Sequence, residues 1–300
     1  MKQGKIKKST GMVEKPTFAG KVADVIIILL CALVAFCSIV PLWHVFMCSF
    51  SDGRELLAHK GLVVLPVGTF NWDGYKLIFQ DASLLKGYAN TLIYVVGATF
   101  FGMFINVTGG YALSQNIRFK PFFTLFVVFT TLFGGGLVPT YMVIKNLGWI
   151  GSRWSLLIPG CTNAISVVMM MNAFLMVPKE TVEAARIDGA GHLDIMLKVM
   201  LPQAMNLGSV LILMSVVGQW NAWFNASIYL PNNRDAWPLQ LWIKEIIANN
   251  VNFLQTSNPD YGRYLIQYSL IVIATLPIIV IFPFFQEKME KAVIAGAVKG

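Results

Sequence analysis

The chain has 300 residues, of which 56% are hydrophobic and 13% are charged, and its formal net charge at pH 7 is +8. An ordinary soluble domain carries about 25% charged residues. This composition excludes a soluble enzyme, a nucleic-acid-binding domain and a disordered chain.

Six stretches of the sequence contain no Asp, Glu, Lys or Arg and are 23 to 35 residues long. Each exceeds the roughly 20 apolar residues that a helix needs to cross a bilayer. Two shorter uncharged stretches contain Pro, Gly or several Asn and cannot span. The sequence therefore predicts an all-α membrane protein with six transmembrane helices, over residues 24–47, 88–114, 121–144, 154–177, 205–229 and 264–285.

The first predicted span has an alternative interpretation, because a Lys-rich start followed by an apolar run is also typical of a secretory signal peptide. The apolar stretch over 24–47 is too long for a signal peptide, and Ala32 and Ala35 are followed by more apolar residues. We therefore interpret it as an uncleaved helix, with His44 and Trp43 as interfacial residues near its outer end.

Lysines dominate the first 21 residues, where six of them stand against Glu14 alone. Because basic segments stay on the cytoplasmic side of a membrane, we expect residues 1–23 to form a cytoplasmic arm. Six crossings then place the segments 48–87 and 230–263 outside the cell, and the segment 178–203 and the tail 286–300 inside it. We expect residues 88–285 to form the core permease domain, which includes the coupling loop 178–203. Both termini are expected in the cytoplasm. The excess of basic residues therefore sets the orientation of the chain in the membrane, and nucleic acid is not an expected partner.

Groups that ion coupling or catalysis would require are missing from the predicted spans. No Asp, Glu, Lys or Arg lies well inside any of them, whereas secondary carriers and pumps retain such groups for function. The sequence has no H-E-x-x-H helix, paired intramembrane carboxylates or C-x-x-C spacing. It therefore predicts neither an enzyme nor a metal site.

Three consecutive glycines, Gly134 to Gly136, interrupt the third predicted span. They do not form a phosphate-binding loop, since that motif requires G-x-x-x-x-G-K-[ST]. With Pro139 downstream, we expect them to bend the helix, and the bend is a candidate gating element.

Amide and indole side chains gather at the end of the fifth predicted span. Amides supply hydrogen bonds to hydroxyl groups, and indoles supply flat apolar faces for sugar rings. The candidate substrate-pathway residues are Gln219, Trp220, Asn221, Trp223 and Asn225, together with Asn172 of the fourth span. Helix-to-helix hydrogen bonding and an aromatic belt at the interface remain alternatives.

The cytoplasmic segment 178–203 predicts a compact helix-turn-helix on the inner membrane face. Pro178 favours a helix start, and Asp188 with Gly189 ends that helix in a turn. A second short helix is expected from His192 to about Met200, stopped by Pro202.

The first of these helices has residues suited to docking against a partner. Ala184 and Ala185 permit close backbone approach, and Glu183, Arg186 and Asp188 offer charges that fix its register. An interfacial amphipathic loop is the alternative.

The same segment resembles a known signature. The pattern E-A-A, three residues, G, nine residues, I-x-L-P marks the permease subunits of ABC importers. The chain has Glu183-Ala184-Ala185, Gly189 and Val199-Met200-Leu201-Pro202, and only Val199 departs from the pattern. The resemblance implies the type I importer permease (MetI-like) fold with a cytoplasmic coupling helix.

Two further resemblances indicate the MalG-like carbohydrate permeases, similar to oligosaccharide permeases of Gram-positive bacteria. They are the pair Trp220-Asn221 and the C-terminal sequence Ala295-Gly296-Ala297-Val298-Lys299-Gly300. The resemblance implies import of a sugar or oligosaccharide across a bacterial cell membrane. A permease of the same fold for a peptide or a polyamine is the alternative.

The resemblance also implies partners. These are a second permease subunit, making a heterodimer, two ATPase subunits, an extracellular solute-binding lipoprotein and membrane lipid. ATP and Mg would be bound by the ATPases, and no cofactor by this chain. The helix from Glu183 to Gly189 would dock in an ATPase cleft, with Pro202 closing the motif. Gly296, Lys299 and Gly300 would contact the ATPases from the C-terminal tail.

Overall fold

The computed structural model describes residues 18–249 and 259–297, and within these residues it contains helices and no strands. This confirms the predicted all-α fold. Most of the predicted N-terminal arm, together with Lys299 and Gly300, lies outside the described residues.

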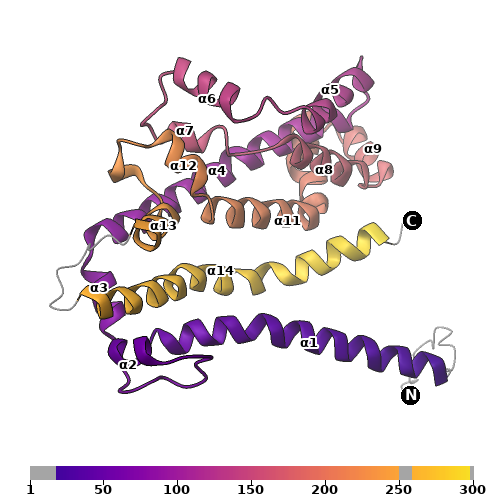
Figure 1. Ribbon diagram of the computed structural model, residues 1–300. Helices are drawn as coiled ribbons and strands as arrows, with labels where there is room; N and C mark the ends of the chain where they lie inside the picture. Colours follow the sequence, from indigo (N-terminus) through magenta and orange to yellow (C-terminus); the bar gives the residue numbers. More distant parts are fainter. Residues whose placement is uncertain (1–17, 250–258, 298–300) are drawn as a thin grey trace, which may run out of the picture.

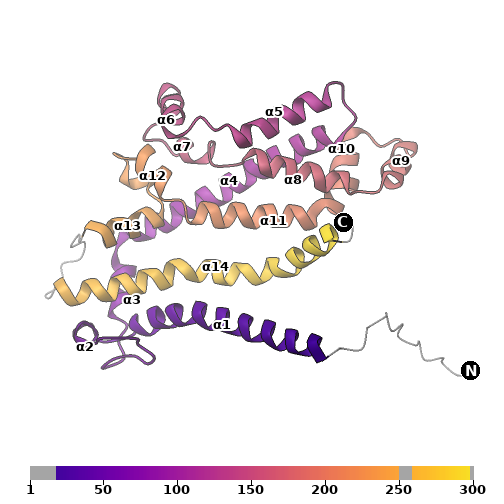
Figure 2. The same cartoon turned by 45° about the vertical axis from the view of Figure 1, so that its right-hand side comes forward.

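Four helical runs are long and apolar enough to cross a membrane, and two bent helix pairs raise the number of candidate spans to six. The four are α1 (Phe18–Cys48), α4 (Ala82–Ser114), the run His192–Trp220, and α14 (Pro259–Ala297). Figures 1 and 2 show α1, α14, α11 and α4 as neighbouring long rods. The described start of α1 and the end of α14 lie at the same end of the bundle.

The third predicted span is broken where the glycine run was expected to bend it. It consists of α5 (Lys120–Leu132) and α6 (Leu137–Asn146), whose axes differ by 111°. Gly136 has φ +78° and ψ −178°, a conformation essentially restricted to glycine. No residue of α5 is buried, so the first half of this pair is only loosely packed on the chain.

The fourth predicted span is not one helix, which corrects the expectation for 154–177. It consists of α7 (Trp154–Leu157), a non-helical stretch over 158–163, and α8 (Ala164–Leu175). Pro159 lacks the N–H that a helix requires, and Gly160 follows it. Asn163 then starts a new helix, because its side chain accepts a hydrogen bond from the backbone N–H of Ser166 (2.9 Å).

The fifth predicted span begins earlier and ends earlier than expected. One helical run joins α10 (His192–Asp194), the π-helical segment η1 (Ile195–Met200) and α11 (Leu201–Trp220). Pro202 therefore does not stop a helix, which corrects the prediction. It lies in the first turn of α11, directly after a π-helical segment whose wider turns alter the pattern of backbone hydrogen bonds.

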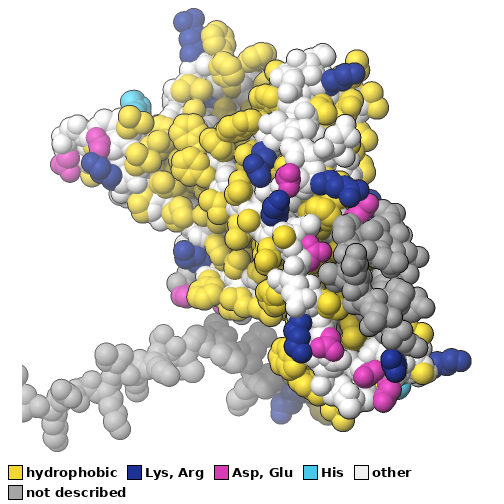
Figure 3. Space-filling view, turned by 90° about the vertical axis from the view of Figure 1, so that its left-hand side faces the viewer, with side chains coloured by type: hydrophobic (Ala, Val, Ile, Leu, Met, Phe, Trp, Pro, Cys, Tyr) yellow, Lys and Arg dark blue, Asp and Glu magenta, His cyan; other side chains and the backbone are white. Residues whose placement is uncertain are grey.

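Two of the connections between the long helices are folded into short helices. The segment after α11 contains α12 (Phe224–Tyr229), the 3-10 turn η2 (Arg234–Ala236) and α13 (Leu239–Asn249). The segment between α1 and α4 contains α2 (Gly53–Ala58) and α3 (Asp73–Gln80), and His44 of α1 accepts a hydrogen bond from Val63 N (3.0 Å). Figure 3 views this end of the molecule, where Lys, Arg, Asp and Glu side chains are interspersed.

The core is organised around α4, which packs against both α8 and α11. Glycines permit this close approach: a Cβ at Gly102 would fall 2.0 Å from the carbonyl oxygen of Cys161, and one at Gly110 would fall 2.9 Å from Met171 N. By contrast, the apolar window of α1 has no buried residues. A central bundle is thus fixed internally, while α1 remains available to lipid or to another chain.

Candidate functional site

The helix α9 (Lys179–Ile187) forms where the sequence predicts it, between Pro178 and Gly189. Gly189 has φ +82°, which a residue with a Cβ adopts only with strain. Its N–H donates to the carbonyl oxygen of Arg186 (3.0 Å), and the N–H of Ala190 donates to that of Ala185 (2.9 Å). These bonds close the helix end, so the turn is sharp and well defined.

The two alanines of the E-A-A pattern face different ways. Ala185 is half-buried and packs with Val182 against a core cluster that includes Tyr111 and Phe174. Ala184 is exposed. One side of α9 is therefore attached to the bundle, and the other is free to meet another surface.

The exposed side combines charges with a large apolar residue. Glu183, Arg186 and Asp188 are exposed, and Ile187 is 86% exposed. This side of α9 thus offers one apolar residue and charges of both signs to a partner surface.

The attachment of α9 reaches two of the long helices. Its core cluster includes Met196 of η1, which continues directly into α11. Near the C-terminal end of α4, the hydroxyl of Tyr111 lies 3.0 Å from Nδ1 of His192. Arg186 Nη2 also donates to Oε1 of Gln115, just after α4, at 3.5 Å. A displacement of α9 would therefore be transmitted to α4 and to α11.

The candidate substrate-pathway residues do not form a single site. Successive helical residues are separated by about 100° around the axis, so Gln219 and Asn221 lie on nearly opposite sides of the end of α11. Trp220 is 2% exposed, and its Nε1 donates to the carbonyl oxygen of Ala274 on α14 (2.9 Å). Trp220 is therefore packed in the core, and it borders a pocket of about 230 Å³ together with Asn221.

The remaining members of that set are dispersed. Trp223 is partly exposed, with the Lys244 ammonium 3.9 Å from its ring centre. Asn225 and Gln219 share the lining of one small pocket of about 230 Å³. Asn172 is an exposed residue in the last turns of α8.

A larger polar pocket lies beside the break between α7 and α8. It has a volume of about 410 Å³ and is bounded by α4, residues 160–163, the start of α8 and the second half of α11. Gln219 is the only residue of its lining that was predicted from the sequence to face the substrate pathway. A signal was present in Pro159-Gly160, because Gly/Pro interruptions of hydrophobic segments mark binding sites in transporters.

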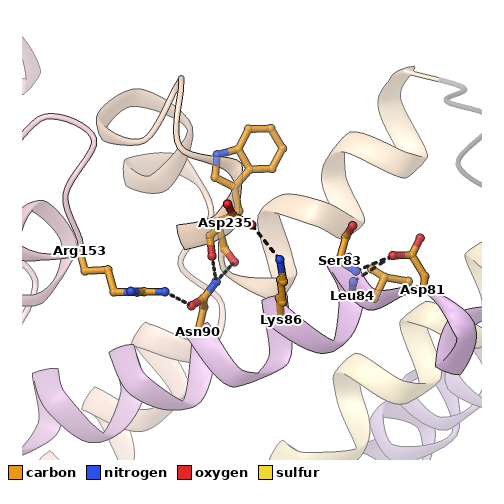
Figure 4. Close-up of polar contacts among 8 residues, drawn as sticks. Asp81, Ser83, Leu84, Lys86, Asn90, Arg153 and Asp235 are labelled. Carbon is orange, nitrogen blue, oxygen red and sulfur yellow. Dashed lines mark hydrogen bonds and ion pairs between the residues drawn. The ribbon is translucent and has the colours of Figure 1, made fainter.

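Asn90, in the first half of α4, joins this helix to two other segments of the chain (Figure 4). Its Nδ2 donates to the carbonyl oxygens of Asp235 (2.7 Å) and Trp237 (3.1 Å), and its Oδ1 accepts from Arg153 Nη2 (2.8 Å). Lys86 Nζ also pairs with Asp235 Oδ1 at 3.0 Å. This network holds the segment between α12 and α13 against α4, so the polar groups here have a structural role.

The family comparison covers the region that contains this machinery. A family model described as the binding-protein-dependent transport system inner membrane component matches residues 110–295. The chain belongs to this family. It is therefore a multi-pass membrane subunit of a transport system, and the matched region includes α9 and the bundle to which α9 is attached.

Individual members of the family align with almost the whole chain. Protein LplC of Bacillus subtilis is 32% identical over 292 residues, which cover 95% of this chain and 97% of LplC. The polygalacturonan/rhamnogalacturonan transport system permease protein YtcP of the same organism is 31% identical, with 89% of this chain and 95% of YtcP covered.

A solved structure is also similar over nearly the whole chain. It comes from a bacterial ABC transporter involved in the import of the acidic polysaccharide alginate, with a TM-score of 0.81 and 26% sequence identity. The match covers 91% of this chain and 98% of that chain. The predicted importer-permease fold is thereby confirmed.

Proposed function

We propose that this chain is the transmembrane permease subunit of an ATP-driven importer that moves a sugar or oligosaccharide into the cell. Its place in the family and the names of its relatives support this substrate class. Besides YtcP, they include the arabinooligosaccharide permease AraQ of Halalkalibacterium halodurans, 25% identical over 90% of this chain. The observation that carries the proposal is α9, an exposed helix whose other face is attached to the spans.

The coupling step uses the exposed side of α9. Ile187 and Ala184 provide an apolar contact that fits a cleft in an ATPase subunit, and Glu183, Arg186 and Asp188 set the register through charge pairs. Gly189 fixes the direction in which the chain leaves the helix. Closure of the ATPases would then move α9 together with η1 and α11, while Pro202 lies at the start of α11.

The energetic requirement of this step is modest. The ATPases, which bind ATP and Mg, need only shift an equilibrium between inward-facing and outward-facing arrangements. A differential binding free energy of about 5.5 kcal/mol moves such an equilibrium from 1:99 to 99:1. This chain binds no cofactor in the proposal, and hydrolysis takes place on its partners.

The complete transporter would contain a second permease, two ATPases and an extracellular solute-binding lipoprotein. The unburied face of α1 is suited to lipid or to the second permease. The proposed orientation places both termini and α9 in the cytoplasm, with α2, α3 and α13 outside. Gly296, at the end of α14, would contact the ATPases together with Lys299 and Gly300 beyond the described residues.

The proposal is tested by ATP hydrolysis of the purified complex in lipid nanodiscs. Binding proteins loaded with arabino-oligosaccharides, maltodextrins or rhamnogalacturonan fragments are added one at a time. Stimulation by one loaded protein, lost in Glu183→Lys, is expected. Intact basal hydrolysis without stimulation by any saccharide would contradict the sugar assignment, and failure to co-purify an ATPase would contradict the importer assignment.

A further inference from the structure

The polar pocket at the α7–α8 break lies where lipid cannot satisfy the backbone. Asn106 contributes to it from α4, eight residues before the helix ends at Ser114, which is about 12 Å along the axis. Residues 158–163 are non-helical at this position. Irregular backbone at membrane depth is tolerated only where protein buries it or where it lines a water-filled cavity. Because Asn163 in the pocket lining is exposed, we expect the second case, in which the pocket faces an aqueous pathway.

The amides of the pocket are each held at one end and unpaired at the other. Asn106 Oδ1 accepts a short hydrogen bond from the Thr162 hydroxyl, Asn163 Oδ1 accepts from Ser166 N (2.9 Å), and Gln219 Nε2 donates to the carbonyl oxygen of Gly160. Within the described residues no hydrogen bond is made by Asn106 Nδ2, Asn163 Nδ2 or Gln219 Oε1. Asn106 as a whole is only 5% exposed, and its unpaired Nδ2 keeps some accessible surface.

These unpaired atoms match the chemistry of a sugar ring. Amide nitrogens donate and an amide oxygen accepts, whereas a sugar hydroxyl does both. Because the other end of each amide is already bonded, their orientations are fixed before a ligand arrives. Apolar walls formed by Met169, Leu211 and Met214 face the same space and suit the C–H surface of a ring.

The residues that line the pocket also limit the charge of the ligand that it can bind. No Asp, Glu, Lys or Arg is among the described residues that line the pocket. A carboxylate transferred into such a site would lack a paired cation, which is costly at low dielectric. The pocket therefore suits an uncharged ring rather than a uronate.

We propose that the α7–α8 pocket of this chain is a binding subsite for one uncharged sugar ring of the transported saccharide, contacted by Asn106, Asn163 and Gln219. This inference rests on the proposed function, and it adds direct substrate contact by this subunit. On binding, the hydroxyl groups of the ring would give up hydrogen bonds to water and form hydrogen bonds to the three amides.

The sharpest test replaces the free donor of Asn163 without removing its helix cap. Asn163→Asp keeps the oxygen that accepts from Ser166 N, and it exchanges Nδ2 for a second, charged oxygen. The complex is reconstituted in proteoliposomes with the loaded binding protein, and saccharide delivered per ATP hydrolysed is measured. We expect this ratio to fall by about two- to tenfold or more, as for the loss of one hydrogen bond. Asn206→Asp is the matched control, because Asn206 is an exposed amide outside the pocket lining.

A second variant tests the volume of the pocket. Gly218 lines it, and a Cβ built there meets no atom within 4 Å. Gly218→Ala and Gly218→Leu should fold, because both residues also favour helix over glycine. We expect saccharide delivery to fall progressively with side-chain size, while the thermal unfolding temperature is unchanged or higher.

The outcomes separate this subsite from the proposed function. Absence of saccharide import by the wild-type complex would contradict the proposed function itself. Wild-type import with an unchanged transport-to-hydrolysis ratio in Asn163→Asp and Gly218→Leu would overturn the subsite. Import of oligomers built only of galacturonate, with the same dependence on Asn163, would overturn the assignment to an uncharged ring.

Discussion

Two bends in this chain differ in composition and in how they are packed: three glycines lie between α5 and α6, whereas Met176, Val177 and Pro178 separate α8 from α9. Between α5 and α6, a Cβ added at Gly134 or Gly136 would meet no atom within 4 Å. Between α8 and α9 the chain turns by 73°, and both arms are anchored by Phe174, Val182 and Ala185 in one core cluster. A bend transmits motion only when both of its arms are packed, so the α8–α9 bend is suited to coupling and the α5–α6 bend to independent movement.

The largest effect on coupling through α9 is expected from Gly189→Pro, in the turn where the chain leaves this helix. Proline fixes φ near −65°, whereas Gly189 has φ +82° and donates its N–H to Arg186. The exit from α9 would be redirected, and we expect saccharide import to fall by at least about tenfold. Uptake by proteoliposomes measures the effect, and membrane insertion of the variant is checked on the same preparation. Normal import would show that the turn after α9 does not take part in coupling.

Charge reversal at Glu183 tests the free side of α9 without touching the bend. We expect Glu183→Lys to abolish the stimulation of ATP hydrolysis by loaded binding protein, since the exposed carboxylate sets the register of docking. Glu183→Gln, which removes the charge without reversing it, should retain part of the stimulation. Equal behaviour of the two variants would argue against a charge pair at this position.

Substitutions at Ala184 and Ala185 distinguish the packing of α9 on this chain from its docking to the ATPase. Ala185 packs against the core and Ala184 is exposed. Ala185→Leu should therefore destabilise the permease by about 1–3 kcal/mol through overpacking. Ala184→Leu should leave thermal unfolding unchanged and weaken co-purification of the ATPase. A similar loss of stability in both variants would mean that α9 is covered on both sides within this chain.

The glycines of the α5–α6 bend should give the smallest effects. Gly134 has no positive φ and open space around it, so Gly134→Ala is expected to alter stability by less than about 0.5 kcal/mol. Gly136 requires a conformation essentially restricted to glycine, and Gly136→Ala should cost about 1–3 kcal/mol. Thermal unfolding of both variants distinguishes the strained position from the open one.

The helix α9 could be predicted from the sequence because local rules determine it. Pro178 and Gly189 set the ends of α9, and the E-A-A pattern lies between them. The same local rules failed at Pro202, since a π-helical segment before it lets the helix continue. A hydropathy pattern shows only which residues are apolar. It cannot predict the π-helical hydrogen bonding of η1.

The polar pocket could be predicted only in part, because it is assembled from three separate segments. Asn106 and Asn163 each resemble ordinary helix-packing residues in isolation. Only the packing of α4 against the break shows which ends of their amides are free. Helical periodicity alone is sufficient to separate Gln219 from Asn221, although the two were predicted to share one site.

The unbroken run from His192 to Trp220 has a mechanical consequence. Its 29 residues include Met196, in the cluster that holds α9, and Gln219, in the lining of the polar pocket. At 1.5 Å per residue the run is about 43 Å long, and a tilt of about 10° around one end would displace the other by about 7 Å. It is therefore a lever arm, and a small displacement near α9 becomes a displacement large enough to open or close a cavity the size of a sugar.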